Sequence, residues 1–232
     1  PERYTERLMN ALQKELRLDR QPRHIECFDN SNLQGAHPVA SCVVFRDGKP
    51  ARKEYRHFNI KTVEGPDDYA SMREVVFRRY SRLQEEGAEL PDLIIADGGK
   101  GQMGVIHEVL EYLGLDIPVA GLAKNDRHRT SELLCGFPPV LVGIRPTSPL
   151  FHFLAHIQEE VHRFAVSFHR QKRSKAFIHS ELEQIEGIGD KTVRTLLQHF
   201  RTVAKVKAAP FEELTALVGP AKAKKIKAFF EK

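Results

Sequence analysis

The stretch "HIECFDNSNLQG", residues 24–35, predicts a buried β-strand that ends in a carboxylate. Ile25, Cys27 and Phe28 make the first half of the stretch apolar, and Asp29 follows them directly. A carboxylate at the end of a core strand loses its hydration without compensation unless a partner binds it. Asp29 therefore requires a cation, a capping contact or a hydrogen-bonded turn.

A second strand with the same ending occurs in "LIIADGGKGQ", residues 93–102, where Asp97 follows an apolar run and precedes two glycines. Neighbouring strands lie about 4.8 Å apart. Two carboxylates at that separation can share one divalent cation, because such cations prefer oxygen ligands. Asp29 or Asp97 alone equally fits a turn-initiating aspartate, but the pair favours a metal site.

Two further sets of residues are candidates for the same site. His162 lies in "EEVHRFAVSFHR", residues 159–170, which has helical spacing, and a lone histidine on such a helix also fits an ordinary packing residue. Asp67 and Asp68 precede another helical stretch, where one of them can serve as the N-cap. Neither His162 nor the Asp67–Asp68 pair is sufficient by itself to indicate a metal site.

The pattern around these residues predicts a layered α/β fold. Strands are expected at 24–29, 40–60 with a turn at Asp47–Gly48, 92–99 and 118–122, and helices within 1–18 and at 69–87, 102–114 and 149–173. A hairpin followed by alternating helices and strands is typical of this fold class. We therefore expect residues 1–173 to form a mixed sheet flanked by helices.

Residues 174–232 differ from the rest of the chain and predict a small all-α domain. They contain 11 Lys and Arg residues against 7 Asp and Glu residues, a difference of +4. Two stretches form an approximate repeat: "LEQIEGIGDKTVRTLLQHF" at 182–200 and "FEELTALVGPAKAKKIKAFF" at 211–230. Each has the pattern of a helix, a glycine turn and a second helix. Repeats of this kind indicate a compact helical module.

The glycine turns of this module are candidate DNA contacts. Without a side chain, a glycine turn lets backbone N–H groups at a helix start approach a phosphate closely. An isolated G-x-G also fits a simple helix cap, but two such turns beside lysines favour DNA binding. The candidate contacts are Gly187, Gly189 and Lys191 in the first turn and Gly219, Lys222 and Lys224 in the second.

Composition narrows the class of protein further. The 232-residue chain has a formal net charge of +5, which suits a polyanionic partner such as nucleic acid. Its three cysteines, Cys27, Cys42 and Cys135, are widely spaced and support neither a disulfide framework nor a cysteine zinc site. No apolar run reaches the about 18–20 residues of a membrane span. We expect a cytoplasmic, non-membrane protein and, since the chain begins at Pro1, a fragment of a longer one.

Five motifs occur in a characteristic order along the chain: "CFDNSNLQG", "FNIKTVEGPDDYASMREVVFRRYSR", "LPDLIIADGGKGQ", "GLAKNDRHR" and "EEVHRFAVSFHRQKR". With the tandem glycine turns that follow, they resemble the C-terminal half of the UvrC family, the nuclease subunits of bacterial nucleotide-excision repair and of the SOS response to DNA damage. The resemblance implies a ribonuclease H-like endonuclease domain at 1–173 and a tandem helix-hairpin-helix domain at 174–232. It also implies metal-dependent hydrolysis of DNA on the 5′ side of a lesion.

The resemblance assigns roles to particular residues. It implies that Asp29, Asp97 and His162 are catalytic and hold Mg²⁺ or Mn²⁺, as one or two ions, with Asp68 as a supporting acidic residue. Whether His162 ligates the metal or transfers a proton stays open. This chain has "EEVHRFAV" where the family more often has an Asp and an Ala before the histidine, which leaves the histidine itself unchanged.

The resemblance also implies partners. They are damaged double-stranded DNA and the proteins UvrB and UvrA, although the family's N-terminal nuclease domain, cysteine-rich segment and UvrB-docking segment are not in this sequence. Basic residues around the expected site are candidate phosphate contacts, namely Lys100, Arg163, Arg78, Arg79 and Arg170. Two alternatives remain: a non-catalytic DNA-binding module, and another ribonuclease H-like nuclease of the resolvase or transposase type.

Overall fold

The computed structural model describes residues 2–31, 39–63, 67–124 and 131–231. Asn32 and residues 125–129 of the "GLAKNDRHR" motif lie outside the described residues. The chain divides into two compact units, Pro1–Ser167 and Phe168–Lys232. This division falls a few residues before the boundary expected at residue 174.

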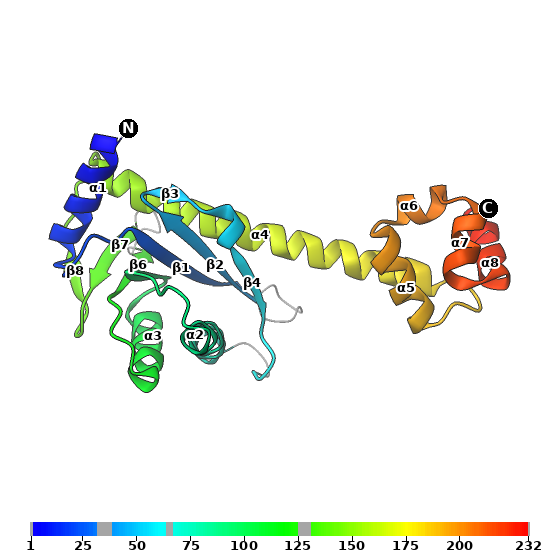
Figure 1. The fold of residues 1–232 in the computed structure, drawn as a ribbon, viewed down its shortest axis with the longest axis horizontal. Coiled ribbons are helices and arrows are strands. Elements are labelled where there is room, and N and C mark those ends of the chain that lie inside the picture. Colours follow the sequence, from blue (N-terminus) through cyan, green and yellow to red (C-terminus); the bar gives the residue numbers. More distant parts are fainter. Residues whose placement is uncertain (1, 32–38, 64–66, 125–130, 232) are drawn as a thin grey trace. The chain divides into compact units, whose positions relative to one another are not determined.

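A single mixed sheet forms the centre of the first unit (Figure 1). Its strands are β1 (His24–Ser31), β2 (Val39–Arg46), β3 (Lys49–Pro50), β4 (Arg56–Asn59), β5 (Leu93–Asp97), β6 (Val119–Lys124), β7 (Ser131–Cys135) and β8 (Val140–Val142). The order across the sheet is β3-β2-β1-β5-β6-β7-β8, and β4 also pairs with β2. β1, β5 and β6 are parallel to one another, and the other pairs are antiparallel.

Helices cover both faces of this sheet (Figure 1). They are α1 (Glu2–Glu15), α2 (Asp68–Glu85), α3 (Lys100–Leu113) and α4 (Pro149–Glu183). On one face the ring of Tyr80 from α2 packs edge-on against Phe28 of β1, with centroids 5.9 Å apart. On the other face Phe153 of α4 packs against Phe45 of β2, also at 5.9 Å. The predicted mixed sheet flanked by helices is confirmed.

The side chains of strand β1 alternate between these two faces of the sheet. Because successive side chains of a strand point to opposite sides, Glu26 and Phe28 contact α2, where Tyr80 donates to Glu26 and packs on Phe28. Cys27 and Asp29 then face α4. Asp29 therefore lies on the side of the sheet from which α4 can supply partners.

Some local expectations are confirmed and others need correction. The hairpin turn at Asp47–Gly48 is present, with positive φ values of 51° and 79° that suit a two-residue hairpin turn. Strands β7 and β8 were not expected, because five and three residues are too short for a clear alternating pattern. Helix α4 continues past residue 173 to Glu183, since the first glycine after its start is Gly187.

The second unit is a small helical module with its own core. Its helices after α4 are α5 (Asp190–Phe200), α6 (Val203–Ala208), α7 (Phe211–Val218) and α8 (Pro220–Phe230). The core includes Leu182, Ile185, Val193, Leu196, Phe200, Leu214 and Ile226. Of the helices in the described part of the chain, none combines the length and apolar character that a membrane crossing requires.

Candidate active site

The sheet register places Asp29 and Asp97 side by side, although β1 continues two residues beyond the expected end at Asp29, to Ser31. β1 and β5 are parallel neighbours with Phe28 opposite Ala96, so the next residues, Asp29 and Asp97, occupy adjacent positions on the same face. Their side chains are only 9% and 7% exposed. Two carboxylates that have lost most of their hydration require partners.

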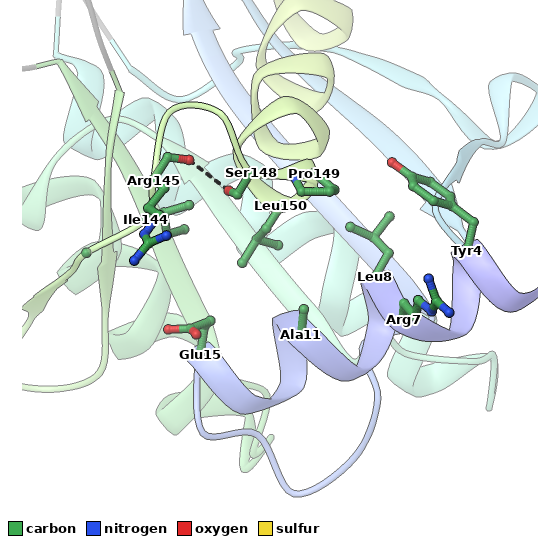
Figure 2. Close-up of a pocket in the computed structure, with 11 residues that line it drawn as sticks. Tyr4, Arg7, Leu8, Ala11, Glu15, Ile144, Arg145, Ser148, Pro149 and Leu150 are labelled. Carbon is green, nitrogen blue, oxygen red and sulfur yellow. Dashed lines mark hydrogen bonds between the residues drawn. The ribbon is translucent and has the colours of Figure 1, made fainter.

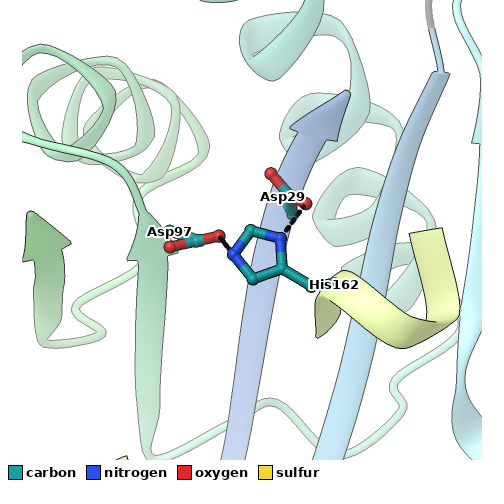
Figure 3. Close-up of side chains that lie close together, drawn as sticks. All are labelled: Asp29, Asp97 and His162. Atoms are coloured by element: carbon teal, nitrogen blue, oxygen red, sulfur yellow. Dashed lines mark ion pairs between the residues drawn. The ribbon is translucent and has the colours of Figure 1, made fainter. Parts of the chain in front are cut away.

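Helix α4 supplies a histidine to both aspartates (Figure 3). The Nε2 atom of His162 lies 3.0 Å from Asp97 Oδ2, and its Nδ1 atom lies 3.4 Å from Asp29 Oδ2. The imidazole is 47% exposed, so it closes the inner side of the site while leaving one side open to solvent.

The donor set of this cluster fits a divalent metal ion. Within the described residues, one ligand atom from each of Asp29, Asp97 and His162 lies within 4.8 Å of the other two. Carboxylate oxygens suit Mg²⁺ and Mn²⁺, and imidazole nitrogen is a ligand for transition metals. Three such groups around one point can hold a single ion and leave positions for water and substrate.

A polar cavity of about 740 Å³ adjoins Asp97. Asn30, Asp68 and Lys100 also line it, together with Tyr69 and the glycines at the start of α3. Asp67 is the N-cap of α2 and accepts from Ala70 N at 3.0 Å, whereas Asn30 Nδ2 donates to the main-chain oxygen of Asp68 at 2.7 Å. Asp68 lines the cavity beside Asp97, and it is not among the three described groups whose ligand atoms lie within 4.8 Å of one another.

The two buried cysteines of the sheet are not nucleophiles. Burial raises the pKa of the Cys27 thiol, and the nearby charges of Asp97 and Asp29 raise it further. Burial likewise raises the pKa of Cys42. Both thiols are therefore protonated at neutral pH.

The first glycine turn of the second unit uses its two glycines differently. Gly187 has a positive φ of 83°, and a Cβ at this position would overlap the side chain of Lys225. Gly189 is the N-cap of α5 with ordinary extended dihedrals, and a Cβ there would meet nothing within 4 Å. The fold therefore requires a glycine at 187 but leaves open space beside 189.

The second turn lies between α7 and α8, and its lysines lie on α8. Gly219 joins these two helices with a φ of 91°. Lys222 Nζ donates to Thr192 Oγ1 of α5 at 2.9 Å, so this lysine ties the two repeats together. Lys191 and Lys224 are exposed and available to a ligand outside the module.

Comparison with known proteins agrees with this architecture. Residues 13–166 match the family model described as the UvrC RNAse H endonuclease domain. The chain belongs to the UvrC family. Residues 180–232 also match the SAM-like Helix-hairpin-helix tandem, so the module that follows the UvrC nuclease domain is of the expected type.

Curated relatives of the UvrC family align with nearly the whole chain. The "UvrABC system protein C" of Bacteroides fragilis is 59% identical over 98% of this chain and 37% of its own length. That of Flavobacterium johnsoniae is 50% identical over 100% of this chain and 38% of its own. The chain thus spans less than two fifths of the length of these relatives.

Solved structures include more distant neighbours. An Endonuclease V (D234N) of Ciona intestinalis, in complex with a 23mer DNA containing an inosine followed by a ribo-adenosine, is 16% identical. The alignment covers 53% of this chain and 58% of that chain, with a TM-score of 0.35.

Two of the candidate arginines have carboxylate partners within the first unit. Arg79 was a candidate phosphate contact, but its side chain is 12% exposed and bonds to the buried carboxylate of Glu26 at 2.7 and 2.8 Å. Arg163 is exposed but binds both carboxylate oxygens of Glu160 on the same helix. Arg79 is therefore part of the core, whereas Arg163 is held at the surface by an internal partner.

Sequence reasoning missed the polar residues that support the site. Gln158 Nε2 donates to Asp97 Oδ1 at 2.9 Å. Tyr55 donates to Glu160 at 2.7 Å, and the hydrogen bonds from Arg163 and Tyr55 lower the pKa of Glu160 to about 2 against the effect of burial. The signal for Gln158 was its spacing, four residues before His162 on one helix, which places both on one face.

A second cavity of about 490 Å³ lies between α1 and the start of α4 (Figure 2). Leu8, Ala11 and Leu150 form part of its wall. Ser148 Oγ accepts from Phe151 N at 3.2 Å and donates to Arg145 O at 2.8 Å, which caps α4 at this end. The cavity shares no lining residue with the cavity beside Asp97 and lies outside the site of the two aspartates.

Proposed function

We propose that this chain is the part of a UvrC protein that cuts the damaged DNA strand on the 5′ side of a lesion. The observation that carries the proposal is the convergence of Asp29, Asp97 and His162, from two strands and a helix, with ligand atoms within 4.8 Å of one another. They would hold Mg²⁺ or Mn²⁺.

The chemistry requires negative ligands and an open face. A bound divalent ion lowers the pKa of water and stabilises the charge that develops on an attacked phosphate. Asp29 and Asp97 hold their oxygens at fixed positions because each directly follows the last residue, Phe28 or Ala96, at which two adjacent core strands pair. His162, half exposed, either completes the ligand set or accepts a proton from the attacking water. Asp68 and Lys100 line the adjoining cavity, where Lys100 can position the DNA backbone.

The second unit would bind the same DNA without reading its sequence. Gly189 supports this role, because its dihedrals suit any residue and its surroundings leave room for a side chain. A glycine at a helix start that the fold does not need suits close approach of a phosphate to the backbone. Exposed Lys191 would add charge beside it, and exposed Lys224 would add charge on α8.

The remaining assignments follow from the family. We propose residues 1–173 as the nuclease domain and 174–232 as the DNA-binding domain. Damaged double-stranded DNA is the substrate, and UvrB and UvrA deliver it in the bacterial cytoplasm. Because the chain spans about 37% of its relatives' length, docking to UvrB is assigned to the complete protein.

The test replaces Asp97 by asparagine, which keeps its size but removes its charge. The chain is assayed in place of the corresponding segment of the Bacteroides fragilis relative, with UvrA, UvrB and a 5′-labelled duplex that carries one lesion. Asp97→Asn should abolish the 5′ incision and leave the melting temperature equal or higher, because the variant loses charge repulsion with Asp29. Normal 5′ incision by this variant would refute the assignment.

Asp92, the residue directly before the same strand, provides a matched control. It precedes β5 at the end opposite Asp97, accepts from His24 N at 2.9 Å and pairs with Arg20. Asp92→Asn should lower stability modestly and retain incision. Cleavage that needs neither lesion nor UvrB would instead indicate another ribonuclease H-like nuclease, and binding without any metal-dependent cleavage would indicate a DNA-binding module.

A further inference from the structure

The two oxygens of Asp97 have different partners, and both partners come from α4. Gln158 Nε2 donates to Oδ1 at 2.9 Å, whereas His162 Nε2 lies 3.0 Å from Oδ2. Gln158 and His162 are four residues apart on one helix, so they lie one above the other on the same face. One turn of helix thus contacts the whole carboxylate.

We propose that Gln158 is a positioning residue that selects which oxygen of Asp97 faces the metal. This inference rests on the proposed function, because it takes Asp29, Asp97 and His162 as the ligands. With Oδ1 engaged by the amide, Oδ2 would be the oxygen that Asp97 offers to a metal ion. The carboxylate plane is fixed before the ion arrives.

An amide is suited to this task for an electrostatic reason. A lysine or arginine could also donate to Oδ1, but its positive charge would repel a cation at the same carboxylate. The neutral amide of Gln158 orients Asp97 without that repulsion. Partners that hydrogen-bond metal ligands in this way typically contribute about 10–100-fold to metal affinity.

The helix that carries Gln158 is itself fixed next to the site. Glu160, two residues on, is 6% exposed and accepts from Tyr55, which precedes β4, at 2.7 Å. Ile157 and Val161 are fully buried. The segment between Gln158 and His162 is therefore held against the sheet, so the amide meets Asp97 at a defined position.

The test removes the amide and measures metal binding directly. Gln158→Met keeps the length of the side chain but cannot donate. Mn²⁺ is titrated into the chain, and the free ion is followed by its electron paramagnetic resonance signal. We expect the Mn²⁺ dissociation constant of Gln158→Met to rise about 10-fold or more. The Mn²⁺ dissociation constant of Gln158→Asn, whose side chain is one methylene shorter, should rise by a similar factor. This variant replaces Gln158→Met in the test if the methionine variant does not fold.

Gln84 is the matched control. Its Nε2 donates to Leu113 O at 2.9 Å, so Gln84→Met loses a hydrogen bond of the same length at the far end of α2. It should leave Mn²⁺ affinity unchanged. In the incision assay, Gln158→Met should raise the Mn²⁺ concentration for half-maximal rate by a similar factor, and saturating Mn²⁺ should restore most of the rate.

The outcomes separate this inference from the proposed function. Mn²⁺ binding by the wild type with equal affinity in Gln158→Met and Gln158→Asn would overturn the role of Gln158 alone. A wild type that binds no Mn²⁺ would overturn the metal site and this inference with it. A parallel loss of affinity in Gln84→Met would identify a general effect of stability and would also overturn the positioning role.

Discussion

At the scale of single residues, Glu26 is a charge in the core that its surroundings keep ionised. Burial alone would raise its pKa, but hydrogen bonds from Arg79, His24 and Tyr80 lower it to about 2. A carboxyl group whose pKa is lower in the folded than in the unfolded state stabilises the fold above its unfolded pKa, here near 4.5. That stabilisation disappears as the pH falls from about 4.5 to about 2.

We therefore expect Glu26→Gln to lower the free energy of unfolding at pH 7 on the order of 3 kcal/mol. The difference from wild type should shrink steadily below pH 4.5, as urea unfolding at several pH values would measure. Glu86, in an exposed pair with Arg82, is the control, since such pairs contribute about 0–1 kcal/mol. A difference that stays constant down to pH 2 would contradict this account.

The same scale shows why part of the site could be predicted from sequence and part could not. Asp29 and Asp97 each directly follow an apolar run, which is visible without a structure. Glu26 carries no such local mark, and the spacing of Gln158 from His162 places the two on one helix face without naming Asp97 as its partner. Their partners, Arg79 and Asp97, lie 53 and 61 residues away in sequence, and only the folded chain brings them together.

At the scale of elements, the two glycines of the first turn should have different roles. Gly187 should matter for the stability of the second unit, and Gly189 for DNA binding. Gly187→Ala should destabilise the second unit by about 1–2 kcal/mol, because an L-residue is strained at positive φ, and Lys225 must also move. Gly189→Ser should leave stability unchanged, since serine is a favourable N-cap and the position has open space. Chemical denaturation of both variants would measure this difference.

The affinity for DNA should follow the opposite order: once both variants are folded, Gly189→Ser should lose more affinity than Gly187→Ala. The new side chain of Gly189→Ser stands where we propose that a phosphate approaches the backbone, so its affinity for a labelled duplex should fall several-fold at moderate salt. Equal affinity of Gly189→Ser and wild type would remove this turn from the proposed DNA interface.

Elements also differ in how well their sequences define them. The long helices α2, α3 and α4 have enough turns to show their spacing, and α4 ends at Glu183, a few residues before Gly187, the first glycine after its start. β7, β8 and α6 have five, three and six residues. Elements of that length depend on the neighbours they pair or pack with, so their sequences carry little independent signal.

At the scale of the whole molecule, the excess positive charge predicts salt-dependent binding. If the module neutralises phosphates, the logarithm of its affinity for duplex DNA should fall by about 0.9 per contact per logarithmic unit of salt. Lys224→Ala should reduce this slope by about one contact. Fluorescence anisotropy at four or five salt concentrations would give both slopes.

Lys222→Ala should behave differently from Lys224→Ala. It loses the hydrogen bond to Thr192 that joins the two repeats, so it should lower the stability of the second unit by about 0.5–1.5 kcal/mol. A Lys222→Ala variant with wild-type stability would show that this bond does not hold the repeats together, and an unchanged salt slope in Lys224→Ala would exclude that lysine from the interface.

The alternating faces of β1 restrict which changes in chain length this protein can accept. One residue inserted or deleted between Glu26 and Asp29 reverses the direction of every side chain beyond it. Asn30 or Phe28 would then face α4 in place of Asp29, and the candidate metal site and the core would be disrupted together. Homologues that acquire or lose single residues should therefore do so in the connections around the sheet, and β1 should keep a constant length throughout the lineage.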